Sequence, residues 1–344
     1  MENQNLSGVY HDIHDVRADV LEMPTISDDA VIIKVGFAGI CGTDLHIYHQ
    51  GLVPPGSVLG HEFSGYITEV GSNVTDFKVG DHVVVNPMTQ GIGLGVSPGG
   101  FAQYIKVENV QKNINLYHLP DSVTPIQGAL IEPLTVALAA VNKTNYSVDD
   151  VTLVTGCGTI GLVTIAALKA KGVKNIIASD ISDIRLEKAK SLGATHTYNP
   201  THPYNPAHPS DLKSFIIKNF GTKMALDYSG ELPNLNTAFE CSGVSALLAD
   251  VINTLAPDGN LTILAIYSKT TTFDPNAIVY KRLTVKGSLF YTFEDFGEAI
   301  DLVANGTIDV SNIVTHTFEL PEIGKAFEIQ ADSTQSIKVT LRMN

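Results

Sequence analysis

The first 130 residues alternate between apolar and polar positions in short runs that are separated by Gly, Pro and Asp. Period-two alternation of this kind is typical of β-strands with one buried face. We therefore expect a small, irregular β-barrel in this part of the chain. Its clearest strands are expected at residues 30–35, 65–70, 82–85 and 101–105.

The pattern changes between about residue 133 and residue 288, where apolar runs alternate with segments of helical periodicity. Such alternation predicts a doubly wound parallel sheet, an α/β fold. The first strands and helices of this region are expected at residues 152–155, 160–171, 175–179 and 184–192.

The C-terminal residues return to a mixed pattern. Thr292 and Asp295 have the spacing of a capping box before the amphipathic residues 296–304, and Pro321 is suited to open a further helix. The chain has 344 residues, and at about 100–200 residues per domain this length predicts two domains.

The composition excludes several classes of partner. The chain has 36 acidic and 22 basic residues, a net charge of −14, and its longest basic cluster is Lys281-Arg282. Because neutralising phosphates requires clustered Lys and Arg, we expect neither nucleic acid nor an anionic membrane surface. Residues 151–168 are uncharged, but their three glycines and four threonines favour a strand, a turn and a helix over a membrane span. Three cysteines and an N-terminus that lacks a basic, apolar leader favour the cytoplasm.

Three glycines with the spacing G-x-G-x-x-G follow the first strand of the expected parallel sheet. Gly156 permits a tight turn, Gly158 lets the backbone approach a pyrophosphate, and Gly161 lets helix and strand pack closely. Thr159 and Ile160 complete the turn and begin the helix. The motif predicts a dinucleotide site in which backbone amides bind the phosphates.

An acidic residue ends the next expected strand. Asp180 follows Gly161 by 19 residues, where a carboxylate is expected to accept hydrogen bonds from ribose hydroxyls. A 2′-phosphate at this position would meet a like charge, and Arg185 is near enough to flank the ribose. We therefore predict NAD rather than NADP.

Metal-binding residue types are found in three segments of the first domain, at Cys41, at His61-Glu62 and at Glu132. Thiolate, imidazole and carboxylate form a ligand set that Zn²⁺ accepts, and three protein ligands leave a fourth position open for water or substrate. Each residue alone has an ordinary structural explanation, but their combination predicts a catalytic zinc site.

The chain resembles the zinc-dependent medium-chain dehydrogenase/reductase family, in its polyol (sorbitol-type) and 2,3-butanediol dehydrogenase branch. The resemblance implies a GroES-like, β-rich catalytic domain formed by residues 1–132 and 289–344, and a Rossmann NAD-binding domain at residues 133–288. The likeness covers almost the whole chain, and besides the glycine turn it includes the motifs at residues 39–46, 60–65, 79–83, 99–102, 132–137, 239–243 and 284–288.

The resemblance implies that Cys41, His61 and Glu132 hold the catalytic zinc, with Glu62 as an additional or transient ligand. Many relatives have a second Cys in the place of Glu132. The Glu-Pro sequence at 132–133 is what indicates the polyol-like branch.

The resemblance also implies a path for the proton of the substrate. An alcohol on Zn²⁺ is a stronger acid, and its proton can pass to the Thr43 hydroxyl and through the cofactor ribose to His46 at the surface. Asp44 is placed to orient the imidazole of His61. The alternative for Thr43 and Asp44 is that they only cap local backbone.

Two segments depart from the family pattern. Residues 86–98 contain no Cys, whereas many relatives have a four-cysteine zinc lobe in this interval. We therefore expect one catalytic zinc per subunit and no structural zinc. Residues 199–210 form a Pro/His-rich near-duplication, which we expect to be a solvated loop; a metal tract at His202 and His208 is the less favoured alternative.

These observations predict an NAD- and zinc-dependent oxidoreductase that interconverts a secondary alcohol, diol or polyol with its ketone. Glu62 and nearby polar side chains are expected to contact further hydroxyls of this small-molecule substrate. The resemblance and the apolar residues 283–289 suggest a homodimer or homotetramer. L-Threonine dehydrogenase is an alternative, because residues 41–48 resemble that branch too. Non-catalytic nucleotide-binding members and zinc-free quinone reductases are less favoured.

Overall fold

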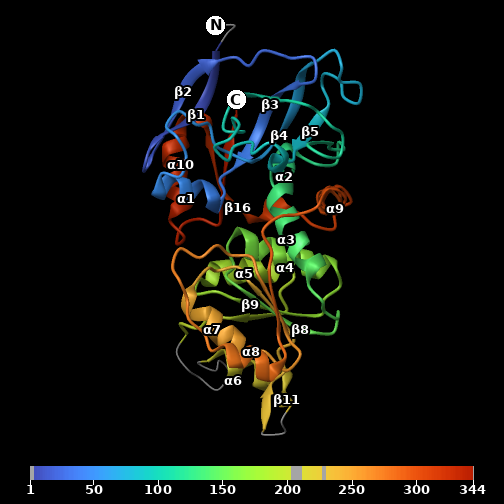
Figure 1. Ribbon diagram of the computed structural model, residues 1–344, viewed down its shortest axis with the longest axis vertical. Coiled ribbons are helices and arrows are strands. Elements are labelled where there is room, and N and C mark those ends of the chain that lie inside the picture. Colours follow the sequence, from blue (N-terminus) through green and yellow to red (C-terminus); the bar gives the residue numbers. More distant parts are fainter. Residues whose placement is uncertain (1–3, 203–210, 227–229, 344) are drawn as a thin grey trace. The chain divides into compact units, whose positions relative to one another are not determined.

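The computed structural model describes residues 4–202, 211–226 and 230–343. The chain divides into two compact units (Figure 1): Met1–Thr135 with Thr292–Asn344, called unit 1, and Val136–Tyr291, called unit 2. The division points lie a few residues after the expected boundaries at 132 and 288. None of the described helices is both long and apolar enough to span a membrane.

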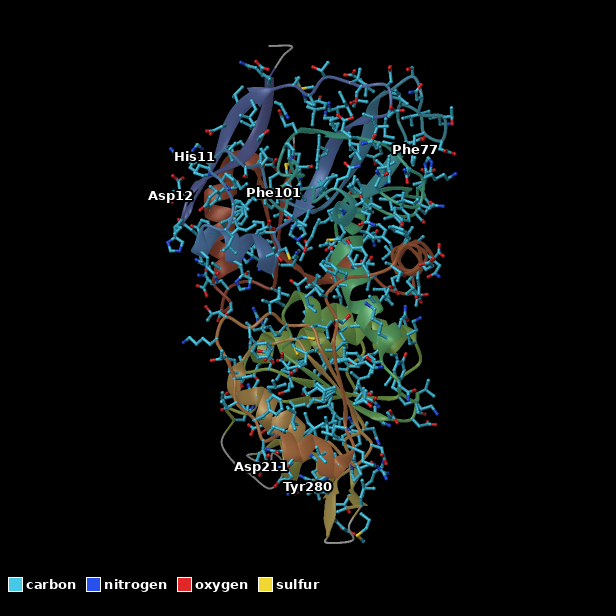
Figure 2. All side chains as sticks on the ribbon, in the orientation of Figure 1. His11, Asp12, Phe77, Phe101, Asp211 and Tyr280 are labelled. Atoms are coloured by element: carbon cyan, nitrogen blue, oxygen red, sulfur yellow. The ribbon has the colours of Figure 1, made fainter. Side chains whose placement is uncertain are left out.

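Unit 1 is built on a seven-stranded, largely antiparallel sheet. Its strand β3 pairs with β4, β6 and β17, so segments far apart in the sequence meet there. The rings of Phe101 and Phe327 pack edge to face in the core (Figure 2 labels Phe101). The seven strands of the sheet are β3 (Val31–Gly39), β4 (Glu62–Val70), β5 (His82–Val85), β6 (Tyr104–Val107), β7 (Leu116–His118), β16 (Val314–Glu319) and β17 (Lys338–Arg342); β1 (Gln4–Asp12) and β2 (Asp15–Glu22) form a separate two-stranded sheet.

Helices complete unit 1 at the ends of these strands, and α3 runs across the division point into unit 2. The helices are α1 (Gly42–Gln50), α2 (Pro125–Ala129), α3 (Ile131–Lys143), α9 (Phe293–Ala304) and α10 (Ile323–Ala331), with 3₁₀ turns at Pro87–Thr89, Val310–Ile313 and Leu320–Glu322.

Unit 2 contains a six-stranded parallel sheet in the order β10-β9-β8-β13-β14-β15. Figure 1 shows α4 and α5 on one side of this sheet and α6, α7 and α8 on the other. The strand order reverses between β8 and β13, which is the arrangement of dinucleotide-binding folds. The elements are β8 (Val151–Thr155), α4 (Thr159–Ala170), β9 (Asn175–Ser179), α5 (Asp183–Ser191), β10 (His196–Tyr198), α6 (Leu212–Phe220), β11 (Thr222–Met224), β12 (Glu231–Pro233), β13 (Thr237–Glu240), α7 (Ser245–Thr254), β14 (Asn260–Ile263), α8 (Pro275–Lys281) and β15 (Thr284–Gly287).

Most predicted elements are confirmed. The uncharged residues 151–168 form β8, the glycine turn and most of α4. Strand β6 begins at Tyr104 rather than at 101, because the preceding residues bridge to β1 instead: Gly8 N–H donates to the Phe101 carbonyl at 2.6 Å. Hairpins β1–β2 and β11–β12 and helix α1 were not predicted.

The capping box before α9 is confirmed. The Thr292 hydroxyl accepts from the Asp295 N–H at 3.2 Å, and the Asp295 carboxylate accepts from the Thr292 N–H at 2.9 Å. Pro321 opens a 3₁₀ turn that leads directly into α10. At the start of the Pro/His loop, His202 lies 3.0 Å from the Asp183 carboxylate; residues 203–210, which include His208, lie outside the described residues.

Candidate active site

The N-terminus of α1 positions Cys41. The Cys41 Sγ accepts a hydrogen bond from the Thr43 N–H at 3.5 Å, and the Asp44 carboxylate accepts from the Cys41 N–H at 2.8 Å. This reciprocal pair is a capping box in which Cys and Asp replace the usual Ser or Thr and Glu. The sulfur therefore lies at the N-terminus of the helix.

Strand pairing brings His61 and Glu62 to Cys41. Gly39, the last residue of β3, lies opposite Glu62, the first residue of β4. The residues that follow β3 and precede β4 are therefore neighbours. One ligand atom each from Cys41, His61 and Glu62 lie within 4.8 Å of one another. Sulfur, nitrogen and oxygen donors at this spacing suit a Zn²⁺ ion with bonds of about 2.0–2.3 Å.

The charge around His61 also suits a cation. His61 Nδ1 and Asp44 Oδ1 are buried, lie 3.6 Å apart and have no hydrogen-bond partner. Burial alone would lower the pKa of His61, but the Asp44 carboxylate and the Cys41 sulfur outweigh it and raise this pKa well above its usual value. Burial raises the pKa of Asp44. This surplus of buried negative donors fits a bound divalent metal.

Glu132 lies beside this group, in the first turn of α3. Its side chain is buried, and its charge contributes to the raised pKa of His61. The mutually closest ligand atoms are nevertheless those of Cys41, His61 and Glu62. The four predicted ligands thus gather in one region of unit 1, with Glu62 rather than Glu132 in the tightest group.

Lys338 is a site residue that the sequence did not reveal. It is fully buried on β17, its ammonium group forms an ion pair with the Glu62 carboxylate, and it donates to the Ile40 carbonyl at 2.9 Å. Gly39 makes room for the pair, because a Cβ there would collide with both charged side chains. Glu62 is only 1% exposed and is held by Lys338; the expectation that it contacts substrate hydroxyls stays a prediction.

Thr43 and His46 lie on α1, one turn apart. Residues three apart share a face of a helix, and both side chains are half-buried. The Nδ1 atom of His46 lies 3.5 Å from Nε2 of Gln50. Asp44, between them, is fully buried; its carboxylate accepts from the Cys41 N–H in the cap and also lies 3.6 Å from His61 Nδ1. The geometry is compatible with both roles expected for Asp44.

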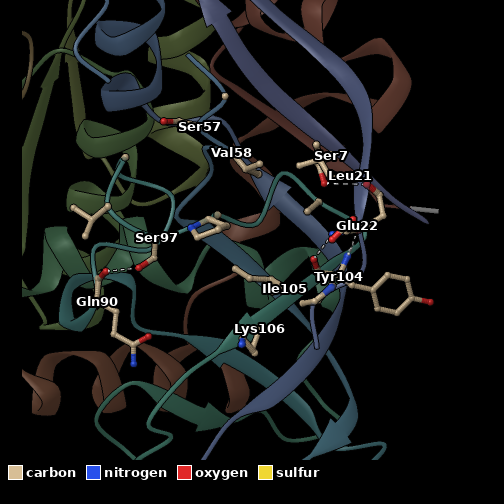
Figure 3. A pocket seen from close by; sticks show the side chains of 18 of the residues that line it. Ser7, Leu21, Glu22, Ser57, Val58, Gln90, Ser97, Tyr104, Ile105 and Lys106 are labelled. Carbon is tan, nitrogen blue, oxygen red and sulfur yellow. Dashed lines mark hydrogen bonds between the residues drawn. The ribbon is translucent and has the colours of Figure 1, made fainter. Parts of the chain in front are cut away.

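A pocket of about 700 Å³ in unit 1 is separate from these residues (Figure 3). Val58 and Ile105 contribute apolar walls, and Gln90 and Ser97 lie at its edge, joined by a hydrogen bond from the Ser97 hydroxyl to the Gln90 carbonyl of 3.0 Å. None of the predicted metal or proton-path residues lines it.

The glycine turn of unit 2 has the predicted geometry. Gly156 has a φ of +82°, a left-handed conformation that favours glycine, and its N–H donates to the Ser179 carbonyl at 2.8 Å. Gly158 is the N-cap of α4 and provides no side-chain cap. The amides at the start of α4, from Thr159 and Ile160 onward, are therefore suited to receive a phosphate.

Asp180 and Arg185 lie beside this turn. One oxygen of the Asp180 carboxylate accepts from the Cys157 N–H at 2.7 Å, and the other accepts from the Ser182 N–H at 2.8 Å. The guanidinium of Arg185 is the nearest group to the position that a Cβ on Gly158 would occupy, at 4.0 Å. Burial raises the pKa of the Cys157 thiol, so it is not a reactive thiolate.

Two glycine variants are expected to differ in the property that they lose, which is NADH affinity in one and stability in the other. A Cβ at Gly158 meets no atom closer than 4.0 Å, so Gly158→Ala should fold normally. The glycine motif predicts that the backbone there approaches the pyrophosphate, so the affinity of Gly158→Ala for NADH should fall about 100-fold, or about 2.7 kcal/mol. A Cβ at Gly161 would collide with the Gly156 carbonyl, and Gly161→Ala should destabilise unit 2 by about 1–3 kcal/mol.

Calorimetric NADH titration and thermal melting of both variants check this pair. Wild-type NADH affinity in Gly158→Ala would contradict the placement of the cofactor. A wild-type melting temperature in Gly161→Ala would contradict the close packing of α4 on the turn.

Comparison with known proteins places the chain in a family. Residues 159–305 match the zinc-binding dehydrogenase family, and residues 27–121 match the alcohol dehydrogenase GroES-like domain. The chain is 33% identical over 364 residues to (R,R)-butanediol dehydrogenase of Bacillus subtilis (strain 168), covering 97% of this chain and 99% of that protein. The chain belongs to the zinc-dependent medium-chain dehydrogenase family. The predicted resemblance is confirmed.

Further relatives agree with this membership. The crystal structure of 2R,3R-butanediol dehydrogenase from Bacillus subtilis has a TM-score of 0.86 at 32% identity, covering 99% of this chain and 100% of that chain. The probable D-xylulose reductase A of Emericella nidulans is 32% identical, covering 94% of this chain and 93% of that protein. The predicted GroES-like and Rossmann folds are confirmed, as is the prediction of a zinc-dependent, NAD-linked alcohol or polyol dehydrogenase. The non-catalytic and zinc-free alternatives gain no support.

The segment between β5 and β6 bears on the number of zinc sites. Residues 86–98 contain none of its three cysteines and form a 3₁₀ turn, Pro87–Thr89, followed by a glycine-rich loop. Among the described residues, a single group of three or more potential metal ligands is found, at Cys41, His61 and Glu62.

Proposed function

We propose that this dehydrogenase interconverts a small vicinal diol or polyol with the corresponding hydroxyketone, with NAD(H) as hydride carrier and one catalytic zinc per subunit. The observation that carries the proposal is the convergence of Cys41, His61 and Glu62 ligand atoms within 4.8 Å, with Asp44 directly behind His61. The names of the butanediol and xylulose relatives favour a substrate with neighbouring oxygens.

Cys41, His61 and Glu132 are the proposed zinc ligands, and Glu62 is an additional ligand that Lys338 restrains. When bound, Zn²⁺ increases the acidity of a hydroxyl that it contacts, and NAD⁺ accepts the hydride. Asp44 holds the imidazole of His61 in the orientation that points its other nitrogen away from the carboxylate. Lys338 keeps one Glu62 oxygen engaged, which limits how far this carboxylate moves.

Thr43 and His46 are proposed to move the proton. The Thr43 hydroxyl, two residues from Cys41, accepts the proton of the substrate hydroxyl as it passes its own proton on in the direction of His46. His46 lies one turn further along α1 and is half-exposed, so it can deliver the proton to solvent.

The cofactor site is proposed at the glycine turn. Gly156, Gly158 and Gly161 shape it, the amides from Thr159 and Ile160 bind the pyrophosphate, and Arg185 flanks the ribose. Asp180 supports NAD over NADP, because a 2′-phosphate near its carboxylate would be repelled.

Assembly as a homodimer or homotetramer is proposed through β15. This edge strand pairs only with β14 among the described strands, and all four of its residues are exposed. Exposed edges of this kind commonly pair with another chain. A cytoplasmic location is proposed because Cys41, Cys157 and Cys241 are all free thiols.

Elemental analysis and a substrate panel test the proposed function. One zinc per subunit is expected, with loss of NAD reduction after chelation and recovery on adding zinc. Among 2,3-butanediol, sorbitol, xylitol and L-threonine, the diol or a polyol should give the highest kcat/KM, with NAD⁺ preferred over NADP⁺. Two zincs per subunit would contradict the single site, and L-threonine as the best substrate would favour the threonine dehydrogenase alternative.

A further inference from the structure

Glu240 lies where the strand order of the parallel sheet reverses. It is the last residue of β13, opposite Thr155 at the end of β8 and Ile263 at the end of β14. From this point β9 and β10 extend the sheet on one side, and β14 and β15 extend it on the other. Ligands of such sheets bind outside the carboxyl ends of the strands at the reversal point.

The Glu240 carboxylate is fully buried and fastens two loops. In the loop after β13 it accepts from the N–H groups of Ser242 at 2.9 Å and Gly243 at 3.2 Å, and from the Ser242 hydroxyl. In the loop after β14 it accepts from the Tyr267 hydroxyl at 2.6 Å. Burial, followed by this hydrogen bond, raises the pKa of Tyr267, which keeps it a donor.

The same loops adjoin the glycine turn. Gly156 lies so close to Ser242 that a Cβ there would collide with the Ser242 backbone, and the Cys241 N–H donates to the Thr155 carbonyl at 2.9 Å. The Glu240 carboxylate thus joins the loops that follow β13 and β14, and the first of these loops packs against the glycine turn. The Thr155 hydroxyl, at 3.4 Å, is a fifth donor to the Glu240 carboxylate. A carboxylate has about four lone-pair sites, so the hydrogen-bonding capacity of Glu240 is filled.

The direction in which NAD(H) crosses the sheet gives the two loops joined by Glu240 a function. This step rests on the NAD site proposed above. The pyrophosphate lies at Gly158 and the adenosine ribose at Asp180, on the β9 side of the reversal point. The other half of the dinucleotide must extend over the ends of β13 and β14. We infer that Glu240 and Tyr267 are positioning residues that hold the loops at 241–244 and 264–267 in the conformation that receives the nicotinamide half of NAD(H).

Comparing the affinities for NADH and ADP tests this inference, because ADP occupies only the adenosine half. Tyr267→Phe removes the hydroxyl and keeps the ring. Its Kd for NADH should rise about 10-fold, whereas its Kd for ADP should stay unchanged. Tyr280→Phe is the matched control: Tyr280 projects from α8 with 75% of its surface exposed (Figure 2), so both affinities should equal those of the wild type.

Glu240→Gln is the second variant. The Gln side chain replaces one acceptor oxygen by an NH₂ group, which then faces the N–H or O–H donors of one of the two loops. The Kd of this variant for NADH should therefore rise more than that of Tyr267→Phe, and its Kd for ADP should again stay unchanged. Wild-type NADH affinity in Tyr267→Phe would overturn the inference, as would an equal loss for NADH and ADP in both variants. Failure of the wild-type protein to bind either ligand would instead overturn the proposed cofactor site.

Discussion

A Cys41→Ala variant is expected to lose its zinc and at least about 1,000-fold of its kcat, since a Lewis acid contributes several kcal/mol and about 4 kcal/mol corresponds to this factor. The sulfur of Cys41 is the single thiol in the proposed ligand group. Elemental analysis of the purified variant and NAD reduction with the best substrate of the panel measure the two losses.

Two control variants separate metal binding from folding. Because Cys41 also caps α1, its replacement by Ala removes a helix cap, at a cost of about 0.5–2 kcal/mol. Cys41→Ser supplies a good capping hydroxyl but a poor zinc ligand, so it should lack zinc and melt like the wild type from which zinc has been removed. Cys241→Ala, at a thiol whose pKa burial raises, should keep its zinc. Full zinc content in Cys41→Ser would contradict the assignment of Cys41.

The glycine turn and the position of Asp180 beside it were predictable because their determinants are local. Gly156, Gly158, Gly161 and Asp180 lie within 25 residues of one another. The apolar runs before the turn and before Asp180 fix the two strands, and neighbouring parallel strands align their carboxyl ends. A short stretch of sequence therefore determines both the shape of the turn and the position of the carboxylate.

The metal region was predictable only in part. The residue types of Cys41 and His61 indicated a ligand set, but their contact depends on the register of β3 with β4. Period-two alternation places Lys338 on the face of the strand opposite Val339. Because the apolar Val339 marks the buried face, the alternation suggests that Lys338 is exposed to solvent. Both faces of β17 are buried instead, and its pairing with β3 brings Lys338 beside Ile40 and Glu62. Register between distant strands is not encoded in either strand alone.

Glu240 was missed for a related reason. Its identity suggests an ordinary polar residue at the end of a strand, and the donors that surround it come from two separate loops. Only the packing of three strand ends explains why a carboxylate is fully buried there.

A Lys338→Met variant is expected to lose about 3–5 kcal/mol of unfolding free energy, the cost of leaving a buried charge without its partner. Methionine has nearly the length of the lysine stem, so the packing of β17 is kept. The change removes the counter-charge of Glu62 and the donor to the Ile40 carbonyl. Urea unfolding measures the loss as a shift of the midpoint to lower concentration.

The same substitution at an exposed ion pair provides the matched control. Lys174 pairs with Asp149 at 2.6 Å, with 65% and 71% of their side chains exposed, and Lys174→Met should change the unfolding free energy by less than about 1 kcal/mol. If the loss at Lys338 arises from the unpaired charge of Glu62, the double variant Glu62→Gln with Lys338→Met should recover part of it, because neither member of the pair then carries a charge. A double variant no more stable than Lys338→Met alone would assign the loss to packing, and unchanged unfolding in the single variant would contradict the role of the pair.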